Sequence, residues 1–309
     1  MNVRFLTRGA LLAAVTVAMA LIGLLPLGGE LVLLLLPLPL SILTYQHGWK
    51  GAVLPLLVAS LLLAFLGHIS LALAVVLFYG LMGIALGNSL RKDAPLWIVF
   101  GGSAAAGAGG LASLWLLGKL IFKQDAFALM QQGLKTALGE AFKLYKSMPL
   151  ASEQLKLLQQ TQKMLLEMVD LAIPAMLALG LLLLLLVNFQ ASRKIIVSLG
   201  GSVVALPPFA RWRLPWYMVW LFIAAFLLRS IGKGWLYQLS LNVYIVTMFL
   251  YVLQGLAIVA GQLSKWGLSR PMRTLILLLA YFFFGQILVL LGLFDTWFDF
   301  RKLGSAERR

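Results

Sequence analysis

Long apolar runs alternate with short polar gaps along most of this chain. A helix needs roughly 20 apolar residues to cross a bilayer. Runs near that length occur at residues 10–27, 30–46, 51–68, 70–89, 96–121, 171–190, 215–231, 235–263 and 272–294. The pattern predicts an all-α, polytopic membrane protein with about nine transmembrane helices, or eight if the second run does not form a span.

The first two runs carry features that modify this prediction. Arg4 and Arg8 precede the first run, as in a signal peptide, but the apolar stretch continues past the cleavage-like Ala18-Met19-Ala20, so we expect an uncleaved span. The second run contains Pro37 and Pro39, which lack amide donors and predict a kinked or broken helix.

Residues 123–170 interrupt the apolar pattern and hold five of the ten acids and six lysines. Apolar residues recur at helical spacing on both sides of Met148-Pro149, which predicts two amphipathic helices. These helices would lie in the membrane interface, form a hairpin, present a partner-binding face or serve as a solvated connector. The chain then divides into a five-span N-terminal bundle (1–122), an extramembrane helical region (123–170) and C-terminal spans with an interfacial tail (171–309).

Composition supports the membrane class. Of 309 residues, 62% are hydrophobic and 11% are charged, and the mean hydropathy is +0.97. The net charge of +15 comes from Lys and Arg that fall mainly in the gaps between runs, where they bind anionic headgroups rather than nucleic acid. The bilayer is the expected partner. The bias of Lys and Arg among the short loops favours a cytoplasmic N-terminus and leaves the side of the C-terminus open.

Candidate chemistry is sparse. The chain has no cysteine, and its two histidines, His47 and His68, lie at span ends without Asp or Glu at ligand-like spacing. No phosphate-binding loop occurs, and no ionisable group lies convincingly at mid-membrane. The sequence therefore predicts no enzymatic activity, no catalytic residues, no metal and no cofactor.

Neutral polar residues do enter the predicted spans. The eighth run contains Asn242, Thr247, Tyr251 and Gln254, and the ninth contains Gln286. Thr247, Tyr251 and Gln254 share one helical stripe, which predicts that this stripe faces the bundle interior. It would either bond the ninth helix through Gln286 or line a pocket, and all five residues are speculative ligand-binding candidates.

Small residues recur at helical spacing in two runs, and such faces let helices approach closely. We predict helix packing or partner contact for Ala10, Ala14, Ala18, Gly102, Ala106 and Gly110.

The end of the chain combines aromatic and charged residues. Trp297 belongs to an aromatic cluster at headgroup depth, and Asp295, Asp299 and Arg301 are predicted to emerge into water beside it as an interfacial tail.

Two stretches carry a family resemblance. "SLNVYIVTMFLYVLQGLAIVAGQL" at 240–263 and "LLGLFDTWFDFRK" at 290–302 resemble the C-terminal signature of the YybS-like family of uncharacterised bacterial multi-pass membrane proteins. The resemblance covers essentially the whole chain. It implies a location in the bacterial cytoplasmic (inner) membrane and no particular activity.

The N-terminal half is similar, more loosely, to S components of energy-coupling-factor transporters. The similarity rests on the alanines at 10, 14 and 18, on "YQHGWKG" and on "GLMGIALGNSLRK". It implies six helices around a small-molecule pocket and docking of a coupling subunit on the alanine face, with an ATPase module as a further partner. Three additional spans and the 123–170 region depart from that pattern.

Two functional hypotheses follow. The first is an S-component-like subunit that binds or helps to transport an unidentified small molecule. The alternative is a non-transporting membrane scaffold or assembly protein that acts through residues 123–170.

Overall fold

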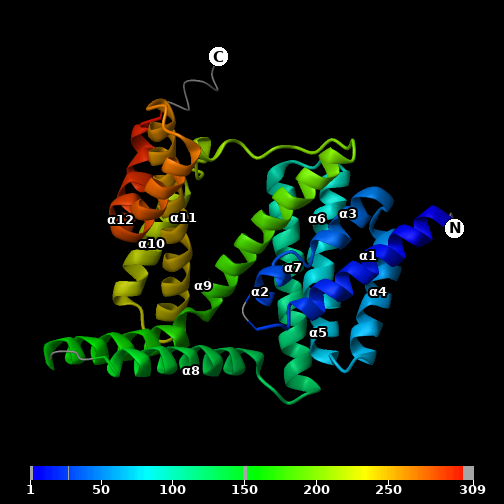
Figure 1. The fold of residues 1–309 in the computed structure, drawn as a ribbon. Helices are drawn as coiled ribbons and strands as arrows, with labels where there is room; N and C mark the ends of the chain where they lie inside the picture. Colours follow the sequence, from blue (N-terminus) through cyan, green and yellow to red (C-terminus); the bar gives the residue numbers. More distant parts are fainter. Residues whose placement is uncertain (1–2, 27, 149–151, 302–309) are drawn as a thin grey trace. The chain divides into compact units, whose positions relative to one another are not determined.

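The computed structural model describes residues 3–26, 28–148 and 152–301, and these residues form helices joined by short connections (Figure 1). Among them, six helices are long and apolar enough to cross a membrane. Three shorter apolar helices, Thr7–Ile22, Trp49–Phe65 and Met218–Ile231, coincide with the first, third and seventh predicted runs. The predicted all-α membrane fold is confirmed.

The chain folds into two compact units. Unit 1 comprises Met1–Gln132 and Leu179–Leu206, and unit 2 comprises Gly133–Ala178 and Pro207–Arg309. The long helix α9 contributes to both units. The three-part division predicted from composition stays a prediction.

Unit 1 contains six apolar helical segments among its described residues, and two of them are shorter helices, Thr7–Ile22 and Trp49–Phe65. Their helices are α1 (Val3–Ile22), α2 (Gly29–Leu33), α3 (Leu38–His47), α4 (Trp49–Phe65), α5 (Ile69–Ala74), the π-helix η1 (Val75–Gly80), α6 (Leu81–Arg91), α7 (Leu96–Leu120) and the second part of α9 (Ser152–Ser198). Helix α2 continues into α3, and α5 continues through η1 into α6, so each series forms one span. Leu36, Leu40, Leu56, Leu63 and Val75 form one of the apolar cores.

The second span is broken, as its prolines predict. The helix is interrupted between Leu33 and Leu38, and Pro37 immediately precedes α3. Neither Pro37 nor Pro39 can donate an amide hydrogen bond, so carbonyl groups of the preceding turn lose their helical partners.

Helix α6 packs against this interrupted span at glycines. A Cβ atom on Gly83 would lie 2.6 Å from the carbonyl oxygen of Pro37, and one on Gly87 would collide with the carbonyl oxygen of Ser41. Larger residues would push α6 away from α3, so the glycines allow the two backbones to touch.

Unit 2 contains α10 (Met218–Ile231), α11 (Trp235–Lys265) and α12 (Arg270–Phe298), which lie side by side in Figure 1. The irregular segment before α10 includes the short helix η2 (Phe209–Arg211). Gly255 and Gly292 lie at the contact between α11 and α12, where a Cβ would collide with the carbonyl oxygens of Leu288 and Tyr251, respectively.

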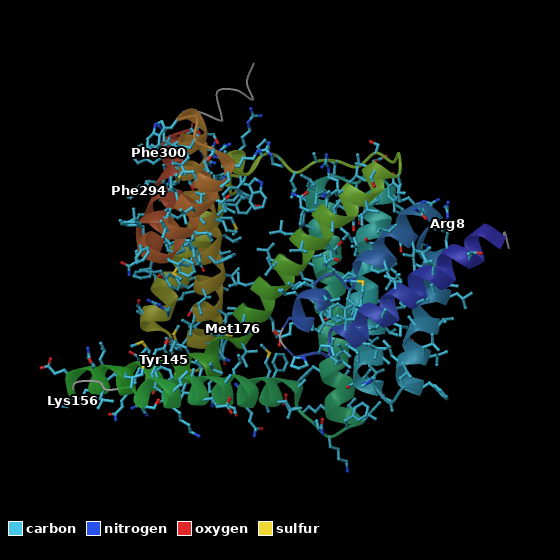
Figure 2. All side chains as sticks on the ribbon, viewed as in Figure 1. Arg8, Tyr145, Lys156, Met176, Phe294 and Phe300 are labelled. Atoms are coloured by element: carbon cyan, nitrogen blue, oxygen red, sulfur yellow. The ribbon has the colours of Figure 1, made fainter. Side chains whose placement is uncertain are left out.

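The predicted amphipathic helices are α8 (Ala126–Lys146) and the first part of α9. Within unit 2 they form a hairpin, in which Lys135 pairs with Asp170 at 2.6 Å and Lys146 Nζ donates to Gln162 Oε1 at 3.0 Å. Figure 2 labels Tyr145 and Lys156 on this hairpin. The second amphipathic helix is not separate from the sixth span, because α9 continues through both.

Candidate functional site

Three side-chain amides are buried among the described residues, those of Asn188, Asn242 and Gln254. Each donates or accepts hydrogen bonds at a place where backbone groups lack regular helical partners. A membrane interior offers no water to such groups, so protein side chains must satisfy them.

Gln254 connects α11 to two neighbouring segments. Its Oε1 accepts from the backbone N–H of Leu214 at 2.9 Å, in the irregular segment before α10. Its Nε2 donates to the carbonyl oxygen of Gly292 at 2.9 Å and lies 3.3 Å from Asp295 Oδ2. The close helix contact at Gly255 and Gly292 brings these groups within reach.

Asp295 and Arg301 form a buried ion pair beside Gln254. Arg301 Nη2 lies 2.7 Å from Asp295 Oδ2, and the exposed fractions of the two side chains are 8% and 0%. Arg301 Nη1 also donates to the carbonyl oxygen of Ala210 at 2.8 Å. The prediction that these two residues emerge into water is therefore wrong: Arg301 turns inward because it neutralises a buried carboxylate and satisfies an irregular backbone.

The remaining tail residues stay at the surface. Trp297 is half-exposed, and Phe294 and Phe300 are also exposed (Figure 2). Asp299 lies 3.7 Å from Arg213 in an ion pair. An aromatic surface of this kind agrees with headgroup depth.

The polar stripe of α11 is buried. Thr247 and Gln254 are each 2% exposed and Tyr251 is fully buried. Gln286 is exposed, and Gln254 reaches α12 through Gly292 and Asp295 instead. The interior position agrees with the predicted stripe, while the ligand-binding assignment of these residues stays a prediction.

Asn242 of α11 contacts the backbone of α9 beside Pro174, which lies inside this continuous helix. Its Nδ2 donates to the carbonyl oxygen of Leu171 and its Oδ1 accepts from the N–H of Ala175, both at 2.7 Å. Those two backbone groups are four residues apart and would bond each other in a regular helix. Pro174 lies between them, so the Asn242 amide replaces the helical bond where the amphipathic arm joins the span.

Asn188 serves the broken second span in unit 1. Its Nδ2 donates to the carbonyl oxygen of Leu34 at 2.6 Å and to that of Leu184 at 2.8 Å. Its Oδ1 is buried without a hydrogen-bond partner among the described residues. One turn further along α9, Ser192 Oγ lies 2.5 Å from Ser41 Oγ of α3.

Asn188 and Ser192 are not among the site residues predicted from the sequence. Their spacing of four residues would place them on one helical face at the end of the sixth predicted run and just beyond it, and this was the available signal. Their contact with the proline-bearing second span required the tertiary fold.

The small-residue faces differ in exposure. Ala10, Ala14 and Ala18 are exposed on α1. On α7, Gly102 is exposed and Ala106 is half-buried, whereas Gly110 is buried against the backbone of Leu77 and Phe78 in η1.

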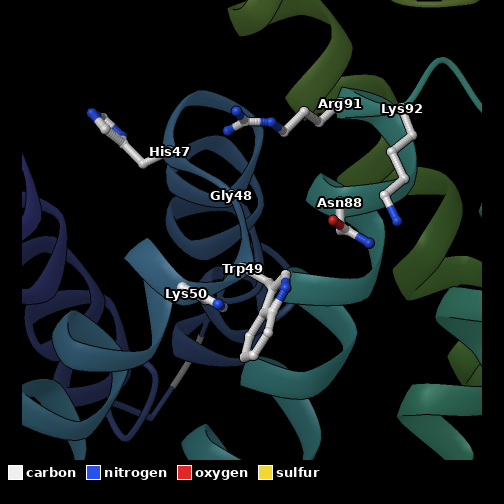
Figure 3. Close-up of a pocket in the computed structure, with 7 residues that line it drawn as sticks. All are labelled: His47, Gly48, Trp49, Lys50, Asn88, Arg91 and Lys92. Atoms are coloured by element: carbon white, nitrogen blue, oxygen red, sulfur yellow. The ribbon is translucent and has the colours of Figure 1, made fainter.

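One cavity of about 300 Å³ lies in unit 1 where the α3–α4 turn meets the end of α6 (Figure 3). Its lining residues are His47, Gly48, Trp49, Lys50, Asn88, Arg91 and Lys92. None of these is acidic, so the cavity presents three permanent cations and an imidazole. In the part of the chain that the structure describes, no group of three or more His, Cys, Asp or Glu residues could hold a metal ion.

The fold and these sites define a multi-pass helical membrane protein, and comparison with protein families agrees. A family model described as a predicted membrane protein (DUF2232) matches residues 13–296, and the chain belongs to that family. No curated protein and no solved structure matches the chain. The expected membership of an uncharacterised membrane protein family and the lipid bilayer as environment are confirmed, while the finer YybS-like assignment, the particular membrane and the orientation stay predictions.

Proposed function

We propose that the protein is an S-component-like membrane subunit that binds a small molecule or helps to transport it. The observation that carries this proposal is the broken span inside unit 1. Interrupted helices in membrane transporters commonly supply the polar groups of a binding site. Here the break faces Asn188, whose buried Oδ1 is available to accept a hydrogen bond.

Two further features support the proposal. Unit 1 has six apolar helical segments among its described residues, two of them shorter than a usual span, and six is the helix number implied by the S-component resemblance. The alanine face of α1 is exposed, so it is available to a coupling subunit. Such a subunit would need separate ATP-binding partners, because the chain contains no phosphate-binding loop.

The test is cross-linking in native membranes followed by purification of the full chain. We expect recovery of ATP-binding subunits and a transmembrane coupling subunit. Ala14→Trp should reduce that recovery by blocking close approach, whereas Val15→Trp, at a lipid-accessible position beside the alanine face, should not. A preparation that lacks both partners would contradict the proposal.

The second candidate function is a scaffold or assembly protein that acts through residues 123–170. The hairpin of α8 and α9 favours it, because Leu144, Leu157 and Met164 expose apolar surface beside lysines. A partner helix or a membrane surface would cover such a face.

Replacing residues 124–168 by a short flexible linker distinguishes the two functions. The spans remain, so a subunit that binds a small molecule should keep binding, which mass spectrometry of co-purified compounds would detect. A scaffold should lose its cellular phenotype while the protein still inserts.

A further inference from the structure

The basic cavity of unit 1 carries an inference that does not depend on the proposed function. We propose that it binds the phosphate group of an anionic phospholipid. Lys50, Arg91 and Lys92 line the cavity without an acidic residue among its lining. Basic pockets between membrane helices are suited to anionic headgroups.

The local backbone shapes this cavity for an anion. Gly48 has a φ of 79° and ends α3, so the chain turns sharply into α4. Arg91 Nη1 lies 3.4 Å from the carbonyl oxygen of Tyr45, which holds the guanidinium beside this turn. The first turn of α4 has no side-chain cap, and its amide groups add to the positive potential.

The surroundings favour a lipid over a free anion. Trp49 is 52% exposed, and Lys50 Nζ lies 5.6 Å from the centre of its ring. Exposed tryptophans of this kind lie at headgroup depth.

An apolar surface continues from the cavity along α4. Leu54, Leu57 and Leu61 are 50%, 46% and 68% exposed. At 100° per residue, all three lie within roughly 40° of Lys50 around the helix axis. Acyl chains therefore have an apolar surface to pack on directly below the phosphate group, which a soluble phosphate would not use.

The test uses the purified full chain and native mass spectrometry. Binding of phosphatidylglycerol and of phosphatidylcholine with identical acyl chains is measured for the wild type and for the triple variant Lys50→Gln, Arg91→Gln, Lys92→Gln. A matched control carries Lys233→Gln, Lys265→Gln and Arg270→Gln, which remove the same charge from exposed span ends outside the cavity. Inorganic phosphate in excess forms a third arm.

We expect the cavity variant to bind phosphatidylglycerol at least about tenfold more weakly, and the control to bind as the wild type does. Equal losses in both variants would mean diffuse attraction and would overturn the proposal. Displacement of the lipid by inorganic phosphate would assign the cavity to a soluble anion and would overturn the proposal as well.

Because Lys50, Arg91 and Lys92 are exposed, replacing them leaves the apolar core unchanged. The single variants Lys50→Gln and Lys92→Gln repeat the comparison if the triple variant fails to fold, and unchanged binding in both would contradict the proposal.

Discussion

At the residue scale, buried polar side chains in unit 2 stabilise backbone that is not helical. Gln254 accepts from the N–H of Leu214, and Arg301 donates to the carbonyl oxygen of Ala210. Both backbone groups belong to the irregular segment before α10. Leaving a buried donor or acceptor without a partner costs about 1–3 kcal/mol. These side chains therefore define where that segment packs.

Replacement of Gln254 tests this role. Gln254→Leu removes the partner of the Leu214 N–H, so we expect the free energy of unfolding to fall by about 1–3 kcal/mol for that unsatisfied donor, whereas the Gly292 carbonyl keeps its contact with the Thr296 hydroxyl. Gln190→Leu and Gln262→Leu are matched controls at exposed positions. Thermal unfolding in detergent measures all three, and equal melting temperatures would refute the assignment.

The ion pair predicts strong coupling between its two members. Asp295→Asn or Arg301→Met alone should destabilise the protein by about 3–5 kcal/mol, because each leaves one buried charge uncompensated. The double variant should be less destabilised than the sum of the single variants. A double-mutant cycle in detergent measures this difference, and additive effects would mean that the two charges do not interact.

A third residue-scale prediction concerns Asp125, at the start of α8. A hydrogen bond from the Trp115 indole, at 3.1 Å, is the main cause that lowers the pKa of Asp125 from its usual 3.8, and backbone N–H groups of Phe127 and Ala128 contribute. A lowered pKa means that the carboxylate stabilises this connection above pH 3.8 and loses its effect as the pH falls through the lowered value.

The tryptophan fluorescence difference between wild type and Asp125→Asn should therefore persist from neutral pH down to about pH 4 and vanish at lower pH. The same comparison is repeated in proteins that carry Trp115→Phe, with and without Asp125→Asn. The fluorescence difference should disappear there if the Trp115 indole is responsible. A difference that is independent of pH would contradict the assignment.

At the element scale, two membrane segments contain prolines, the broken second span and the continuous helix α9, and an asparagine from another helix bonds the backbone beside the proline in each. Asn188 bonds Leu34 beside Pro37, and Asn242 bonds both backbone groups around Pro174. Proline lacks the amide and displaces the carbonyl four residues earlier, so the backbone requires a substitute partner.

The proline inside α9 gives a specific coupling prediction. Asn242→Leu should destabilise unit 2 by about 1–3 kcal/mol for each backbone group left unsatisfied. Pro174→Ala allows Leu171 and Ala175 to bond each other, so the double variant should recover much of the loss. Hydrogen exchange of residues 171–178 measures the local effect. If Asn242→Leu and the double variant lose equal stability, the Asn242 side chain does not take the place of the helical bond between Leu171 and Ala175.

Sequence periodicity predicted the elements better than their partners. The nine apolar runs, the break near Pro37 and the interior face of Thr247 and Gln254 all follow from local spacing. The inward turn of Arg301 does not, because a basic residue after an aromatic cluster usually marks the membrane surface. Its burial depends on Asp295 and on the irregular segment containing Ala210, which only the tertiary fold brings together.

At the scale of the whole molecule, the number of membrane crossings depends on the shortest span. Helix α10 has 14 residues, or about 21 Å at 1.5 Å per residue, against a hydrocarbon thickness of about 30 Å. Irregular backbone is tolerated at membrane depth only where protein covers it. In the segment before α10, Gln254 satisfies the N–H of Leu214 and Arg301 satisfies the carbonyl of Ala210. We therefore expect this segment and α10 together to complete one crossing.

Single cysteines can test this crossing without background, because the natural sequence has none. Lys92→Cys and Lys233→Cys place thiols at exposed positions after α6 and α10, and Lys265→Cys places one at the exposed last residue of α11. With a cytoplasmic N-terminus and a crossing α10, a membrane-impermeant maleimide should label only Lys233→Cys in intact spheroplasts, and all three after permeabilisation. If α10 does not cross, Lys233→Cys should be protected and Lys265→Cys labelled instead, because α11 would then run in the opposite direction. That exchanged pattern would show that the irregular segment returns to the same side of the membrane.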